Sequence, residues 1–427
     1  MFEKILVEQN KQWNSFDVDL GIIRTKLRLI QKYLSLKHII TLTGVRRCGK
    51  SVLLKQIINC LLNKKVKKEN ILFLNLENPY FDEYKDNIKN LELILDDYYK
   101  LMNPQGKIYL FLDEIQFFKN WQVFIKSKYE NSNIKFIITG SNSQLLSSEL
   151  ITLLSGRTLN IYLYPFDFKE FLLAKKIEIK SKIDLLKNQN LIRKHFDEFV
   201  RWGGFPEIAF IKDNNTKKEI LENYYKNILY HDIIPRFGIK NIDKTEKLAH
   251  YLLSNIGKPF SYNKLSKLIA LSDKTVKEYT NYFSKAYLLF ELKHFDFSIK
   301  KQINTPKKVY AIDTGLINSI SFKFTEDIGR LYENLVFVEL KRRGKEIYYH
   351  KDMYECDFIV KEESKITQAI QVCKSIKDPD TRKREILGIK EAIKKYKLKT
   401  ALILTENEEE IINKEIQAIP LWKWLLE

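Results

Sequence analysis

The residues best suited to chemistry lie between two apolar runs near the N-terminus, in the segment GVRRCGKS. Glycines in such a loop let backbone N–H groups curl around phosphate oxygens, and the following helix presents its positive end to them. Lys50 would reach the β- and γ-phosphates, and Ser51 would ligate Mg²⁺. A simple glycine turn explains neither the Gly-Lys-Ser order nor the apolar strand before it. The sequence therefore predicts a phosphate-binding loop formed by Gly44, Val45, Arg46, Arg47, Cys48, Gly49, Lys50, Ser51 and Val52.

A second apolar run, KIYLFLDE, ends in two adjacent acids. Asp113 is expected to hold the magnesium ion, and Glu114 is suited to polarising an attacking water. Two acids at this position would also fit a solvated strand end. Because the phosphate-binding loop lies upstream, we expect ATP and Mg²⁺ as cofactors, hydrolysis as the reaction, and Lys50 and Glu114 as catalytic residues.

These residues require a sheet to position them. Apolar strands are expected before Gly44 and at 70–76, 107–114, 134–139 and 159–163, with helices at 17–34, 91–101, 121–129 and 144–153. Strands that alternate with helices predict an α/β fold with a parallel, doubly wound sheet, whose ligand groups gather at the carboxyl ends of the strands.

Two polar residues follow the fourth strand, and one arginine precedes the fifth. Ser141 or Asn142 would lie near a γ-phosphate and could orient the attacking water, or they could cap the helix at 144–153. Arg157 stands alone between a helix and a strand, where an arginine is usually a surface charge.

Length and cysteine usage restrict the class of protein. The 427 residues suffice for two to four domains. The N-terminus lacks a signal-peptide layout, and no apolar run is long enough to cross a membrane. A soluble cytoplasmic protein without a membrane partner is expected, since a reducing compartment also suits cysteines that form no pair at metal-ligand spacing: Cys48, Cys60, Cys356 and Cys373.

The balance of charge favours nucleic acid as a partner. The chain carries 73 Lys and Arg against 54 Asp and Glu, a formal charge of +19 that would attract a phosphate polymer. A coding bias towards A+T or adaptation to high temperature would give a similar lysine-rich composition. Charge therefore favours nucleic-acid binding without deciding it.

The middle of the chain changes character. Residues 165–240 are helical and aromatic, as expected of a lid or adaptor. From 244 to 312 the pattern gives a helix, a short helix, a turn, a long helix and two short strands, which is the layout of a winged helix. Its long helix would present Lys274, Lys277, Tyr279 and Thr280 outward. Winged helices bind DNA or dock proteins, so both kinds of partner stay open.

The order of these segments resembles the AAA+ superfamily, and more narrowly a widespread prokaryotic family of AAA+ ATPases with a C-terminal domain. The resemblance implies that Arg157 is an arginine finger acting on the nucleotide of a neighbouring copy, which requires a homo-oligomer. It also implies that Asn142 is the first sensor and that Asn75 restrains Glu114. The segments that carry it span nearly the whole chain: GVRRCGKS, FLDEIQ, ITGSNS, LSGR, YPFDFKEF, RWGGFPE, VYAIDTGL, GRLYENLVFVELKRRG and ECDFIV.

The last hundred residues resemble the PD-(D/E)xK nuclease fold. In that fold an acid on the first helix, an Asp on the second strand and a Glu-x-Lys on the third bind metal and activate water. Glu333 and Asp357 match the first two positions, whereas Gln371-Val372-Cys373 replaces the third and Lys374 falls one residue late, on the opposite face. An inactive descendant that binds nucleic acid or a protein partner without cutting is therefore expected, with Lys341, Arg342 and Arg343 as a basic helix end for phosphate contacts.

Four domains are expected: a P-loop ATPase domain (1–164), a helical lid or adaptor (165–243), a winged-helix-like domain (244–312) and a degenerate nuclease-like domain (313–427). The sequence thus predicts an ATP-hydrolysing AAA+ protein that couples its nucleotide state to sequence-independent DNA binding. The alternatives are a nucleotide-gated protein-docking switch with little turnover and an ATP-dependent DNA nuclease.

Overall fold

The computed structural model describes residues 1–141, 154, 156–321 and 327–427, which form two compact units, 1–163 and 164–427. Unit 1 is built on a five-stranded sheet in the order β2-β3-β4-β1-β5, and every pair of neighbours is parallel. The predicted parallel α/β sheet is therefore confirmed. Its strands are β1 (Ile39–Thr43), β2 (Ile71–Asn75), β3 (Ile108–Asp113), β4 (Ile134–Gly140) and β5 (Thr158–Tyr162).

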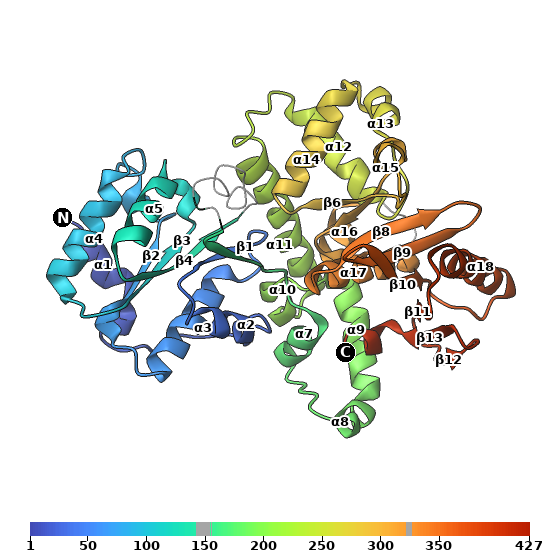
Figure 1. Ribbon diagram of the computed structural model, residues 1–427, viewed down its shortest axis with the longest axis horizontal. Coiled ribbons are helices and arrows are strands. Elements are labelled where there is room, and N and C mark those ends of the chain that lie inside the picture. The colour runs from blue at the N-terminus through green and yellow to red at the C-terminus, as the bar shows by residue number, and fades with distance from the viewer. Residues whose placement is uncertain (142–153, 155, 322–326) are drawn as a thin grey trace. The chain divides into compact units, whose positions relative to one another are not determined.

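Helices cover both faces of this sheet, as buried strands require. One face packs its alternate strand residues, such as Leu110 and Leu112, against the apolar sides of α4 and α5. Figure 1 shows α2 and α3 on the other side of the sheet. The helices of unit 1 are α1 (Glu3–Gln9), α2 (Leu27–Tyr33), α3 (Lys50–Asn63), α4 (Lys89–Met102) and α5 (Trp121–Asn131).

The helix predicted at 17–34 is wrong in its first half, because only α2 is helical. The carbonyls of Leu20 and Ile22 accept hydrogen bonds of 2.7 and 2.8 Å from the side-chain amide of Gln56 on α3. This segment therefore lies as an irregular strap against α3. The helix predicted at 144–153 lies outside the described residues.

Unit 2 begins with helices and ends with a sheet. The helical part consists of α7 (Phe168–Ala174), α8 (Lys182–Lys187), α9 (Gln189–Trp202), α10 (Pro206–Phe210), α11 (Asn214–Asn227), α12 (Ile242–Ser254), α13 (Tyr262–Ile269) and α14 (Asp273–Lys285). An antiparallel pair follows, β6 (Leu289–Leu292) with β7 (Lys308–Ala311). The order α14, β6, β7 agrees with the predicted long helix followed by two short strands. The sequence analysis missed α15 (Ile299–Asn304), a short helix between these two strands.

The final sheet has six strands in the order β12-β13-β11-β10-β9-β8 and mixes parallel with antiparallel pairs. Its strands are β8 (Glu346–Lys351), β9 (Glu355–Glu362), β10 (Lys365–Val372), β11 (Ala401–Thr405), β12 (Glu410–Ile411) and β13 (Ile416–Pro420), and its helices are α16 (Thr314–Ile320), α17 (Ile328–Arg342), α18 (Pro379–Tyr396) and α19 (Leu421–Trp424). No helix among the described residues is long and apolar enough to cross a membrane.

Two of the quoted motifs meet inside unit 2. In RWGGFPE, a Cβ on Gly203 would lie 1.8 Å from a carboxylate oxygen of Asp313, which belongs to VYAIDTGL. That carboxylate accepts the backbone N–H groups of Gly204 at 2.7 Å and Gly315 at 2.8 Å. Burial raises the pKa of Asp313 to about 6. These motifs therefore join the helical part of unit 2 to the helix that follows β7.

Candidate functional site

The predicted phosphate-binding loop connects β1 to α3. Gly49, at φ 97°, turns the chain into α3, which begins at Lys50. A Cβ on Gly44 would come within 2.2 Å of the carbonyl oxygen of Leu163, so only glycine fits there. Arg47 also adopts a left-handed conformation, at φ 68°. The loop residues thus have the backbone shape and helix start that phosphate binding requires.

The Lys50 ammonium lies at the centre of the loop. Its Nζ is 3.2 Å from the Gly44 carbonyl oxygen, 3.4 Å from that of Val45 and 3.3 Å from Oε1 of Glu114. Burial by itself would lower the pKa of Lys50, but the interactions with Glu114, Cys48 and Asp113 together outweigh burial, and the pKa is raised. Conversely, burial by itself would raise the pKa of Glu114, but Lys50, Gln116 and Arg46 together bring it below its ordinary value. Both groups therefore stay charged at neutral pH.

The neighbouring carboxylate of Asp113 accepts a hydrogen bond from the Thr139 hydroxyl and another from Ser51. Burial, and then Glu114, raise the pKa of Asp113. A hydroxyl and a carboxylate side by side are the oxygen ligands that Mg²⁺ takes beside a nucleotide. Ser51 and Asp113 therefore fit the predicted magnesium site.

Glu114 is held by Gln116, which the sequence analysis did not name, and by Ser141, which the sequence analysis expected near the γ-phosphate. Its backbone lies in the left-handed region at φ 55°, a conformation uncommon outside glycine. Its carboxylate accepts hydrogen bonds from the Gln116 side-chain amide and, at 3.1 Å, from the Ser141 backbone N–H. Asn75, expected to restrain Glu114, instead accepts the backbone N–H of Glu77 at 3.0 Å. Asn142 lies outside the described residues.

Arg24 is a further residue that the sequence did not reveal. Its guanidinium is buried and donates a 2.6 Å hydrogen bond to the carbonyl of Cys48, in the phosphate-binding loop. Its backbone N–H donates to Gln56, the residue that also holds the strap before it. No local motif marks Arg24, since the arginine and the loop are brought together only by the packing of the strap on α3.

Arg157 is not brought to the loop of its own chain. It directly precedes β5, where Thr158 pairs with Ile39 at the start of β1, whereas the phosphate-binding loop follows the end of β1. Its Nη1 lies 2.7 Å from Oε1 of Glu130, and its guanidinium lies 5.4 Å from the centre of the Tyr129 ring. Arg157 therefore lies at the amino ends of the strands, and the phosphate-binding loop lies at their carboxyl ends.

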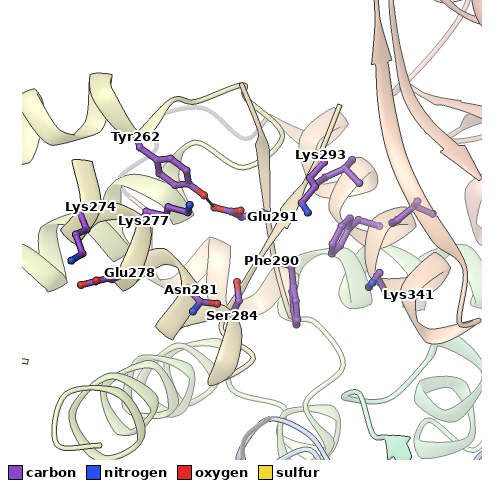
Figure 2. Close-up of a pocket in the computed structure, with 13 residues that line it drawn as sticks. Tyr262, Lys274, Lys277, Glu278, Asn281, Ser284, Phe290, Glu291, Lys293 and Lys341 are labelled. Carbon is purple, nitrogen blue, oxygen red and sulfur yellow. Dashed lines mark hydrogen bonds between the residues drawn. The ribbon is translucent and has the colours of Figure 1, made fainter. Parts of the chain in front are cut away.

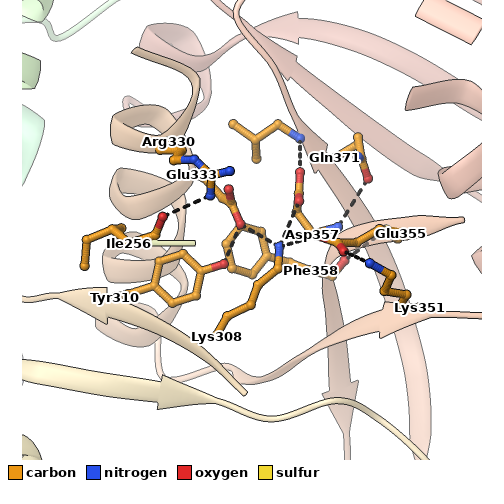
Figure 3. Close-up of polar contacts among 12 residues, drawn as sticks. Ile256, Lys308, Tyr310, Arg330, Glu333, Lys351, Glu355, Asp357, Phe358 and Gln371 are labelled. Carbon is orange, nitrogen blue, oxygen red and sulfur yellow. Dashed lines mark hydrogen bonds and ion pairs between the residues drawn. The ribbon is translucent and has the colours of Figure 1, made fainter. Parts of the chain in front are cut away.

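A second cluster of charged residues lies in unit 2 (Figure 3). We call Glu333, Glu355, Asp357 and Glu385 the acidic cluster. The Lys308 ammonium, from β7, is 2.8 Å from Glu333 Oε1, 2.8 Å from Glu355 Oε1 and 3.3 Å from Asp357 Oδ1. Burial would lower the pKa of Lys308, but these carboxylates raise it well above its ordinary value. The ammonium is therefore the counter-ion of the cluster.

The predicted residues Glu333, Asp357 and Gln371 do converge here, but Lys374 does not. The Gln371 side chain accepts the Asp357 N–H at 3.2 Å and donates to Glu385. A cavity of about 560 Å³ opens beside these groups. Lys374 is exposed and does not line it. The third strand lacks the Glu-x-Lys pair, but Lys308, Glu355 and Glu385 bring a lysine and two further acids to the cluster from other positions.

A groove of about 710 Å³ lies between the segment predicted as a winged helix and later elements of unit 2, bounded by α14, β6, α17 and β8 (Figure 2). Lys274, Lys277, Lys293 and Lys341 bring four ammonium groups to it, and we call it the lysine groove. Two acids, Glu278 and Glu291, also line it. Burial lowers the pKa of Lys341. The groove is therefore a concave surface of positive charge suited to phosphates.

Four residues that the sequence analysis expected to contact a partner instead make contacts within unit 2. Tyr279 and Thr280 are buried, with Val276 and Phe283, along the inner stripe of α14. Arg342 and Arg343 both form ion pairs with Glu339. Arg342 also donates to the carbonyl of Pro165, and Arg343 to that of Trp424. These two arginines therefore serve the packing of unit 2.

The fold and the first site define an AAA+ P-loop ATPase domain, and comparison with known proteins agrees. A family model described as AAA domain matches residues 36–172, and one described as Domain of unknown function (DUF8612) matches residues 193–327. An AAA domain implies nucleotide binding, typically with Mg²⁺. It occupies the part of the chain that holds Lys50, Ser51, Asp113 and Glu114.

Two relatives match over most of their length. The uncharacterized protein MJ1544 of Methanocaldococcus jannaschii is 36% identical over 431 residues, covering 96% of this chain and 90% of that protein. An uncharacterized protein of Haemophilus influenzae is 33% identical over 392 residues, covering 90% and 94%. The chain belongs to the family of these two proteins. Among solved structures, Orc1 of Aeropyrum pernix in complex with DNA matches with a TM-score of 0.31 and 10% identity, covering 72% of this chain and 95% of that one.

Proposed function

We propose that the protein hydrolyses ATP in unit 1 and couples its nucleotide state to nucleic acid bound by unit 2. The observation that carries the first half is the 3.3 Å contact between the Lys50 ammonium and the Glu114 carboxylate, beside Asp113 and Ser51. A lysine for the phosphates, a magnesium pair and an ionised base then lie within one site. This set is what hydrolysis of a nucleoside triphosphate needs.

Each residue has a separate role in this reaction. Glu114, ionised and oriented by Gln116 and the Ser141 N–H, accepts a proton from the attacking water. Lys50 leaves its carbonyl partners to contact the β- and γ-phosphates. Ser51 and Asp113 would hold Mg²⁺, which would supply positive charge against the charge developing on the phosphates. The first step is therefore general-base catalysis.

The lysine groove supports the second half of the proposal. Phosphate contacts from lysines are independent of sequence and weaken as salt is added. Lys274 and Lys277 are exposed on α14, which follows α13 in the order of a helix-turn-helix pair. The proposed partner is therefore DNA bound without base readout.

One measurement tests both halves of the proposal. We expect phosphate release from ATP that requires Mg²⁺ and rises severalfold when duplex DNA is added at low salt. The Lys274→Gln/Lys277→Gln variant should keep its basal rate and lose the stimulation, because the substitutions remove two phosphate contacts and leave unit 1 intact. DNA retention by the same variant should also show a shallower dependence on salt.

The matched control is Lys264→Gln/Lys267→Gln, which removes two exposed lysines of α13 outside the groove. It should be stimulated as the wild type is. Equal loss of DNA stimulation in both variants would assign the effect to net charge and would refute the proposal that DNA binds in the lysine groove. Tight ATP binding with negligible turnover, with or without DNA, would instead favour the alternative of a nucleotide-gated switch that docks a protein.

We further propose that Arg157 acts on the nucleotide of a neighbouring copy, since in its own chain it lies at the opposite end of the strands from the phosphate-binding loop. Arg157→Ala should then lose turnover, retain ATP affinity, and regain activity when mixed with Lys50→Ala. Glu130→Gln is the control, because it frees the guanidinium from its 2.7 Å ion pair and should preserve turnover. A protein that stays monomeric with ATP and turns over normally without Arg157 would contradict the proposal.

The acidic cluster favours a second candidate function, metal-dependent cleavage of a phosphodiester bond. The specific observation is the position of Lys308 among Glu333, Glu355 and Asp357 beside an open cavity. Carboxylates would bind Mg²⁺ or Mn²⁺, and an ammonium would stabilise charge on the phosphate under attack. This candidate requires the ammonium to move off the carboxylates when metal binds.

A further inference from the structure

A group of ligand atoms unrelated to either site lies where the segment after β6 meets β8. His294 follows β6, His350 is on β8, and Asp352 lies in the turn after it. A nitrogen of each imidazole and an oxygen of Asp352 lie within 4.8 Å of one another. Backbone hydrogen bonds fix this approach: the Phe295 N–H donates to the Tyr349 carbonyl at 2.9 Å, and the Tyr349 N–H donates to Lys293 at 3.0 Å.

The two histidines differ in the hydrogen-bond partners of their ring nitrogens. His350 is fully buried, and its ring nitrogens lie 2.9 Å from Oε1 of Glu391 and 3.0 Å from the Tyr396 hydroxyl. His294 is only 6% exposed, and its ring nitrogens have no side-chain hydrogen-bond partner in the described part of the chain, only the nearby backbone of Lys351. Leaving a buried polar group unsatisfied is destabilising. Hydrogen bonds account for both ring nitrogens of His350, whereas one carbonyl of the Lys351 backbone can account for at most one ring nitrogen of His294.

We propose that His294, His350 and Asp352 bind one transition-metal ion of the zinc class. Two imidazoles and a carboxylate are the donor set of four-coordinate Zn²⁺, with bonds of about 2.0–2.2 Å and ligand atoms roughly 3.4 Å apart in a tetrahedron. The three ligand atoms, now within 4.8 Å of one another, would have to draw closer to reach that spacing when the metal binds. Imidazole ligands select this class of metal over Mg²⁺. Glu391, already in contact with His350, is placed to supply the fourth ligand.

The structure also contains a competitor for the metal. Nζ of Lys395 lies 2.6 Å from Oδ2 of Asp352, so binding requires Asp352 to exchange an ammonium for the ion. Removal of that ammonium should therefore strengthen metal binding, the reverse of what removal of a ligand does. Bound metal would fasten the segment after β6 to β8, which is the edge strand of the six-stranded sheet.

The test uses the full-length protein, freed of metal by a chelator and returned to excess Mg²⁺ so that sites made only of oxygen ligands are filled. Co²⁺ is added as a spectroscopic probe, and Zn²⁺ is then added to displace it. We expect one ion per chain, with the visible absorption of tetrahedral Co²⁺. Affinity should fall at least about tenfold in His294→Gln and in Asp352→Asn, and should rise severalfold in Lys395→Met.

The control is His195→Gln, which removes the imidazole of another carboxylate pair in unit 2, 3.1 Å from Glu198. It should bind Co²⁺ as the wild type does. Asp352 is exposed, so Asp352→Asn tests the site even if His294→Gln does not fold. Absence of the tetrahedral absorption, or equal affinity in the wild type, Asp352→Asn and Lys395→Met, would overturn the proposal. Neither outcome depends on ATP hydrolysis, because Co²⁺ binding is read directly.

Discussion

Glu114→Gln is expected to lower the turnover of ATP by roughly 10²–10⁴-fold, the contribution typical of a general base. The amide keeps the size of the side chain and can still accept hydrogen bonds from Gln116 and the Ser141 N–H, but it cannot take a proton from water. ATP affinity should stay close to that of the wild type or increase, since the Lys50 ammonium loses its carboxylate partner. Phosphate release and equilibrium binding of ATP measure the two effects separately.

Lys50→Ala should behave differently, because it removes a phosphate contact and should weaken ATP binding as well as turnover. The matched control is Glu92→Gln on α4, an exposed carboxylate 3.7 Å from Lys128 and outside the site. Its turnover should equal that of the wild type. Wild-type turnover in Glu114→Gln would contradict general-base catalysis by this residue. Weak ATP binding in Glu114→Gln, equal to that of Lys50→Ala, would show that Glu114 serves the loop rather than the reaction.

Lys308→Met is expected to lower the free energy of unfolding of unit 2 by about 3–5 kcal/mol, because it leaves buried carboxylates without their counter-ion. The methionine fills most of the space of the lysine stem but offers no charge to Glu333, Glu355 or Asp357. Denaturant unfolding measures the change. The control is Lys361→Met on β9, whose partially exposed pair with Glu346 at 3.0 Å should be worth less than about 1 kcal/mol.

The effects of added Mn²⁺ on stability and on DNA nicking distinguish a structural role of Lys308 from a catalytic one. Mn²⁺ should stabilise Lys308→Met more than the wild type, because it replaces the missing positive charge. If the cluster cleaves DNA, wild-type protein should nick supercoiled DNA in Mn²⁺, while Lys308→Met and Asp357→Ala should not. Nicking that survives in Asp357→Ala would place cleavage outside this cluster. Absence of nicking, with Mn²⁺ stabilising only Lys308→Met, would leave a buried ion cluster that serves the fold.

Local pattern was sufficient for unit 1, because its site is built from residues that directly follow strands. The loop after β1 and the two acids at the end of β3 meet at the carboxyl ends of the parallel strands, as the order of the segments in the sequence implies. Gln116 could have been found as well, two residues beyond Glu114. Arg24 could not, since it reaches the loop through an irregular strap held by Gln56.

Unit 2 was harder because its site is assembled from distant segments. Glu355 could have been predicted, since it alternates with Asp357 on one face of a strand. The burial of Tyr279 could also have been read from Val276, Tyr279, Thr280 and Phe283, an apolar stripe at helical spacing. Lys308 could not, because it lies on β7, before the helix that carries Glu333, and nothing in its neighbours marks it as a counter-ion.

That position of Lys308 has a consequence for folding. Lys308 precedes in the chain every carboxylate that it contacts. It belongs to the antiparallel pair of β6 and β7, whereas those acids belong to α17 and β9. The carboxylates cannot be buried at low cost until this pair of strands has docked, and the pair gains its partner only when the sheet has formed. Hydrogen exchange should therefore find β7, α17 and β9 opening together, as one cooperative unit, and not as two modules that happen to touch.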